Sequence, residues 1–159
     1  MRKNSRGFSL IELLIVVAII LIIAAIAIPD LLKSRQAANQ ASAVGSMRTL
    51  NTSEVTYAST YTTGFSSTLA QLDGTVTPSD ANSAGLIDTV LGSGLKSSYT
   101  FTYTPTNITA TPPRVDGYHV QAGPVAGTGN GNFYYTDESG VIRQNTSTTA
   151  TSTDSPLAG

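Results

Sequence analysis

The sequence predicts an α+β fold in which one long N-terminal helix packs on a small antiparallel β-sheet. Three observations carry this prediction. An apolar run extends from Phe8 to Ile28, apolar residues then recur with helical spacing to about Tyr61, and residues 98–144 contain segments with the alternation of strands. Strands joined by short turns, with no helical crossover between them, favour an antiparallel meander. The 159-residue chain leaves room for one modest domain beyond the helix.

The apolar run is long enough to cross a membrane. Its residues would form a helix of roughly 31 Å, which matches the hydrocarbon thickness of a bilayer. Glu12 interrupts the run, and a charge at the centre of such a helix costs roughly 2.5–3.5 kcal/mol on insertion scales. Glu12 lies near one end and costs less, but an acid among Leu and Ile still indicates a functional residue whose partner must be found.

Three basic residues, Arg2, Lys3 and Arg6, precede the apolar run. Positive charge is retained on the cytoplasmic side of a membrane, so the N-terminus is expected inside and the bulk of the chain outside. Small residues at Ala25 and Ala27 also allow an ordinary signal-peptidase site after Ala27. That reading, like a plain single-span anchor, gives Glu12 no role.

The basic leader, the segment from Gly7 to Ile20 (GFSLIELLIVVAII) and the following AAIAIP that ends at Pro29 resemble the prepilin signature of type IV pilins and type II secretion pseudopilins. The resemblance implies cleavage between Gly7 and Phe8 by a dedicated prepilin peptidase, and N-methylation of Phe8. It also implies that Glu12 meets the N-terminal amine of a neighbouring subunit inside a filament, and that the fold is the ladle-shaped α+β fold of pilins.

The resemblance therefore implies a structural subunit and no enzyme. It would be a single-pass inner-membrane precursor that polymerises with its own kind into an extracellular type IV pilus, served by an assembly platform and motor ATPases. A type II secretion pseudopilin is the alternative within the same family. A secreted binding domain released by an ordinary signal peptidase is the alternative outside it.

Two residues govern the continuity of the expected helix. Pilins commonly have glycine where this chain has Leu21, and leucine is roughly 0.8 kcal/mol better than glycine in a helix. Pro29 removes a backbone donor and clashes with the preceding turn, so we expect a kink there. Any unwinding in a filament should be confined to about residues 23–29.

The rest of the chain follows the same patterns. We expect a short helix with Leu86, Val90 and Leu91 facing inward, and a turn at Gly140 with positive φ. Two strands should present one apolar face each, made of Tyr99, Phe101 and Tyr103 and of Tyr118, Val120 and Ala122. The expected organisation is a leader (1–7), a membrane or filament-core helix (8–29), an amphipathic helix (30–61), an αβ-loop (62–97), the sheet (98–144) and a flexible Ser/Thr-rich tail (145–159).

Candidate chemistry outside the helix is sparse. The lone His119 has no Cys or second His to join it and is read as a surface residue. Asp116, Asp137 and Glu138 could collect a calcium ion, as loop carboxylates do in related pseudopilins, although acids in a glycine-ended turn are also ordinary hairpin residues. No other cofactor is expected, no basic face for nucleic acid is visible, and cysteine is absent.

Overall fold

The computed structural model describes residues 8–74, 80–110, 113–127 and 131–157. The leader expected at 1–7 therefore lies outside the described residues. The chain divides into two compact units, Met1–Ala37 and Ala38–Gly159. Helix α1 (Leu10–Thr60) supplies the described helix of the first unit and continues into the second.

The described part of the first unit is the N-terminal stretch of α1. The helix starts where the Ser9 carbonyl accepts the backbone N–H groups of Glu12 (3.1 Å) and Leu13 (3.2 Å). It is helical on both sides of Pro29 and through residues 23–29 in the isolated chain. Its best 18-residue window has a mean hydropathy of 3.3, so α1 is long and apolar enough to cross a membrane.

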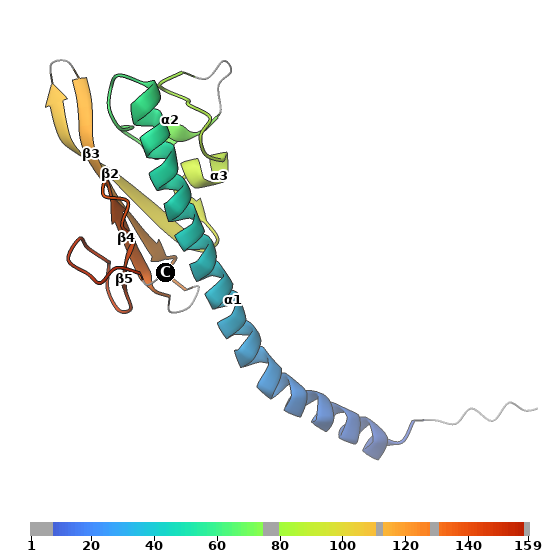
Figure 1. Cartoon of the computed structure of the whole chain (residues 1–159). Coiled ribbons are helices and arrows are strands. Elements are labelled where there is room, and N and C mark those ends of the chain that lie inside the picture. Colours follow the sequence, from blue (N-terminus) through green and yellow to red (C-terminus); the bar gives the residue numbers. More distant parts are fainter. Residues whose placement is uncertain (1–7, 75–79, 111–112, 128–130, 158–159) are drawn as a thin grey trace, which may run out of the picture. The chain divides into compact units, whose positions relative to one another are not determined.

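Among its described residues, the second unit contains a five-stranded antiparallel sheet whose spatial order equals its sequence order (Figure 1). Its strands are β1 (Leu95–Lys96), β2 (Tyr99–Ala110), β3 (Pro113–Pro124), β4 (Phe133–Asp137) and β5 (Arg143–Asn145). The antiparallel meander predicted from the short connections is confirmed. Gly140, in the turn between β4 and β5, has a φ of 72°, as the turn chemistry predicts.

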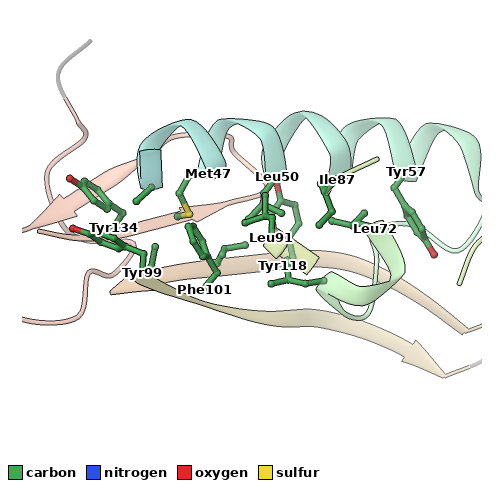
Figure 2. Packing of buried hydrophobic residues seen from close by; sticks show 14 of the residues in the cluster. Met47, Leu50, Tyr57, Leu72, Ile87, Leu91, Tyr99, Phe101, Tyr118 and Tyr134 are labelled. Carbon is green, nitrogen blue, oxygen red and sulfur yellow. The ribbon is translucent and has the colours of Figure 1, made fainter. Parts of the chain in front are cut away.

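The core lies between the second part of α1 and one face of the sheet (Figure 2). Met47, Leu50 and Tyr57 of α1 are buried against this face. The strand residues below them are those that the alternation placed inward, including Tyr99, Phe101, Tyr118, Val120 and Ala122. Fully burying a side chain of this size contributes roughly 1.5–3 kcal/mol, so this interface is the main source of stability for the unit.

The described residues of the αβ-loop include two short helices, α2 (Leu69–Leu72) and α3 (Thr89–Gly92). The side chain of Asp88 caps α3 by accepting the N–H of Leu91 at 2.9 Å. Leu91 is buried as predicted, but Val90 is 54% exposed, so its expected inward position is wrong. The reason is that α3 begins only at Thr89, and Leu86 and Val90 consequently share no helical face.

Residues 145–157 of the Ser/Thr-rich tail, expected to be flexible, make specific contacts with one another and with Ile142. The Asp154 carboxylate accepts hydrogen bonds from the Asn145 side chain (2.9 Å) and the Thr151 backbone N–H (2.7 Å). These bonds hold the pKa of Asp154 below its usual value. Ala150 is fully buried, and the N–H of Leu157 donates to the Ile142 carbonyl at 2.7 Å. Composition predicts disorder here because it does not reveal such specific bonds.

A buried carboxylate on α1 fastens the αβ-loop to the core. Glu54 is fully buried, and its two oxygens accept the N–H (3.0 Å) and the hydroxyl (2.6 Å) of Ser66. The Tyr103 hydroxyl donates to the Ser66 carbonyl at 2.8 Å, so one residue of the loop is held from both the helix and the sheet. Burial raises the pKa of Glu54 above its usual 4.5.

The raised pKa of Glu54 makes a component of stability depend on pH. The Glu54 carboxyl keeps its proton to a higher pH in the folded state than in the unfolded state. Its contribution to the free energy of unfolding is therefore most favourable below about pH 4.5 and is lost as the pH rises through the pKa of Glu54 in the folded state. Glu54→Gln keeps the shape without the charge. Its free energy of unfolding, relative to the unsubstituted chain, should therefore increase between pH 4.5 and pH 7.5, as measured by urea denaturation in detergent micelles.

The buried tyrosines near Glu54 do not titrate in this pH range. Burial raises the pKa of the hydroxyls of Tyr57, Tyr103 and Tyr118, so these groups stay protonated throughout the range. Glu54→Leu serves as the second variant and should be destabilised by about 1–3 kcal/mol, because Ser66 loses both acceptors. If the difference in free energy of unfolding between Glu54→Gln and the parent chain is the same at pH 4.5 and pH 7.5, Glu54 does not have a raised pKa in the folded state.

Candidate functional site: the apolar helix of the first unit

The apolar stretch of α1 in the first unit is exposed in the described part of the chain. Every large apolar side chain from Phe8 to Ile28 is exposed, with Phe8 at 76% and Leu10 at 80%. A contiguous surface of this extent is far larger than the few hundred Å² of a typical soluble monomer. The hydrophobic effect therefore requires an apolar environment around it, which a bilayer or a set of similar helices would supply.

Glu12 is the only ionisable residue between Phe8 and Ile28. It occupies the first turn of α1, where a negative charge is favoured by the helix dipole by about 0.3–1 kcal/mol. That gain is smaller than the cost of a charge in an apolar medium. In an apolar environment, a carboxylate that stays charged is stabilised by a nearby cation.

Phe8 lies just before the helix, close in sequence to Glu12, and is exposed. Gly7, the other half of the expected cleavage site, lies outside the described residues. Pro29, the expected kink, lies inside α1. Glu12 and Pro29 thus lie on one helix, and Phe8 lies two residues before its first residue, Leu10.

The expected calcium ligands do not form a cluster. Among the described residues, no three His, Cys, Asp or Glu side chains are grouped as a metal site. Asp116 is paired with Arg114, while Asp137 accepts the backbone N–H of Ser139 at 3.0 Å, next to the exposed Glu138. His119 stacks on Tyr135 with ring centroids 5.7 Å apart.

One polar link between helix and sheet was not anticipated. The side-chain amide of Asn51 donates to the Thr136 hydroxyl at 2.9 Å, and its oxygen accepts from the Tyr118 hydroxyl at 3.1 Å. The sequence predicts Asn51 within the amphipathic helix at residues 30–61 and gives it no partner. Its spacing of four residues from the apolar Met47 was the available signal, because a polar side chain on the buried side of a helix needs a partner.

Comparison with known proteins yields one family-model match and one similar curated protein, each over a limited part of the chain. Residues 2–28 match the family model described as the prokaryotic N-terminal methylation motif. A segment of 37 residues is 62% identical to the type IV wide pilus major component PilA4 of Thermus thermophilus. That segment covers 23% of this chain and 28% of the relative, so this chain matches only about a quarter of the relative's length. No solved structure matches the chain.

The family-model match includes Gly7, Phe8 and Glu12 and the exposed apolar stretch that ends at Ile28. The second unit, outside the family-model match, has the long helix and antiparallel sheet of a pilin-like α+β fold. The chain therefore carries the prokaryotic N-terminal methylation motif at residues 2–28 and, over a segment of 37 residues, is similar to a type IV pilus major component.

Proposed function

We propose that this protein is a structural, non-enzymatic subunit of a type IV pilus. The observation that carries the proposal is the exposed apolar stretch of α1, which lies inside the matched methylation motif and holds one carboxylate at Glu12. The chain is first inserted in the inner membrane through this helix. It is then polymerised through the same helix into an extracellular filament.

Processing precedes assembly. A prepilin peptidase hydrolyses the peptide bond between Gly7 and Phe8, which removes the three basic residues of the leader and leaves a new amine on Phe8. The amine is then N-methylated. A secondary amine still accepts a proton at neutral pH, so the methylated terminus retains the positive charge that Glu12 requires.

Assembly is an exchange of one apolar environment for another. The helix leaves lipid for a core of identical helices, which changes the hydrophobic energy little and adds packing contacts. Within that core, the Glu12 carboxylate pairs with the ammonium of Phe8 from a neighbouring copy. Such a pair adds little net stability, but leaving either member unpaired in an apolar core costs about 3–5 kcal/mol. The pair therefore selects the correct register of neighbouring helices.

Other proteins supply the work of this cycle. Besides the peptidase, a membrane platform and motor ATPases must extract the subunit from the bilayer, because the two apolar environments differ too little in energy to drive extraction. The subunit itself contributes the helix that polymerises and the sheet unit that follows it. The precursor is located in the inner membrane and the product on the cell surface.

The mature N-terminus tests the proposal directly. Protein sheared from the surface of the native cell is expected to begin at a monomethylated Phe8, as shown by intact mass and N-terminal sequencing. A terminus at Ile28 in the medium would establish an ordinary secreted protein instead. The same methylated Phe8 found only in the cell envelope would favour a pseudopilin.

The role of Glu12 is tested separately by substitution. Glu12→Gln should still be inserted and cleaved, but the yield of sheared filaments should fall at least tenfold, because the Phe8 ammonium loses its counter-charge. Ser9→Ala is the matched control in the same turn, since the helix start uses only the Ser9 carbonyl, and it should assemble normally. Abundant filaments from the Gln variant would refute the pairing.

A further inference from the structure

A groove lies on the face of the sheet opposite the core. Tyr99 and Phe101 of β2 are buried against α1, so the alternating Thr100 and Thr102 face outward and are exposed. Their partners on β3 are Gly123 opposite Thr100 and Gln121 opposite Thr102. The register thus brings together two hydroxyls, one amide and one residue without a side chain.

The absence of a side chain at Gly123 shapes this groove. A Cβ atom there would lie 3.1 Å from Cδ1 and 3.2 Å from Cε1 of Phe133, so the Phe133 ring lies over the glycine. The space has a volume of about 250 Å³, and Thr149 of the tail is also among its lining residues. An aromatic ring therefore borders a recess lined by hydroxyl and amide groups.

The polar groups of the groove retain hydrogen-bonding capacity. Nε2 of Gln121 donates to the Ala150 carbonyl at 3.1 Å, which orients the amide, while its oxygen has no partner among the described residues. The hydroxyls of Thr100 and Thr102 likewise make no hydrogen bond within the described part of the chain. The exposed threonines of α1 differ, since Thr56, for example, donates to the Thr52 carbonyl at 2.9 Å.

We propose that this groove binds one unit of a neutral saccharide. None of its described lining residues carries a charge, which gives an ionic ligand nothing to pair with. Free hydroxyls and a fixed amide oxygen can exchange hydrogen bonds with sugar hydroxyls, and the Phe133 ring can cover the apolar C–H face of a pyranose. The volume lies below the roughly 300–1,000 Å³ of pockets for drug-sized ligands, which fits a single ring.

The test uses the full chain in micelles of a detergent without a sugar head group. Glucose, galactose, mannose and N-acetylglucosamine are offered as probes, with glucuronate and glucosamine as charged counterparts, and binding is followed by saturation-transfer difference NMR. At least one neutral sugar should bind, and the charged counterparts should bind at least tenfold more weakly. The chain is unassembled in micelles, so the result does not depend on the proposed filament.

Three variants connect the binding to the groove. Thr102→Val removes one hydroxyl at nearly constant shape, and Gly123→Ala displaces Phe133; each should weaken binding at least tenfold. Thr104→Val is the matched control, because Thr104 is the next outward threonine on β2, pairs with His119 and lies outside the groove. Thermal melting verifies that each variant is folded. If Gly123→Ala does not fold, the comparison of Thr102→Val with Thr104→Val still tests the site.

The possible outcomes separate clearly. Loss of binding in Thr102→Val together with retention in Thr104→Val supports the saccharide site. The proposal is overturned if no neutral sugar binds, if only glucuronate or glucosamine binds, or if Thr102→Val binds as well as the parent chain. Equal loss in Thr102→Val and Thr104→Val would also overturn it, because it would indicate a general effect on the sheet.

Discussion

The protein depends first on the placement of one carboxylate in an apolar helix. From Phe8 to Ile28 the helix exposes only apolar and small side chains apart from Glu12, so it must leave water. Any apolar environment then makes the charge of Glu12 costly unless a cation is supplied. In the proposed filament, cleavage after Gly7 creates that cation on another copy of the chain. In this proposal, processing and assembly are linked by the same electrostatic requirement.

The second unit is held together by packing and by polar links between distant segments, since the chain has no cysteine. Glu54 fastens the αβ-loop through Ser66, and Asn51 fastens α1 to the sheet through Thr136. Asp154 gathers donors from the tail in the same way. In each case a buried or half-buried side chain satisfies groups that would otherwise lose water without compensation, so these bonds select one arrangement of segments rich in Gly, Ser and Thr.

The predictions succeeded where side chains follow a local period and were wrong where they do not. Alternation correctly assigned Phe101 and Val120 to the core because neighbouring side chains of a strand face opposite sides. The same reasoning misplaced Val90, since the start of a four-residue helix depends on a capping bond that hydrophobic spacing does not encode. The tail was assigned to disorder from composition, although Ala150 is fully buried.

The sequence by itself determined the apolar helix, its single acid, the methylation motif and the antiparallel order of the strands. Each of these features is carried by contiguous residues. They depend on the length of the apolar run, on helical spacing of apolar residues and on the alternation of apolar and polar residues in strands. Only the tertiary structure decided that Glu54 meets Ser66, that Asn51 meets Thr136, and that Phe133 lies over Gly123 beside two threonines. Such meetings depend on strand register and on the packing of segments far apart in the chain, which no local period specifies.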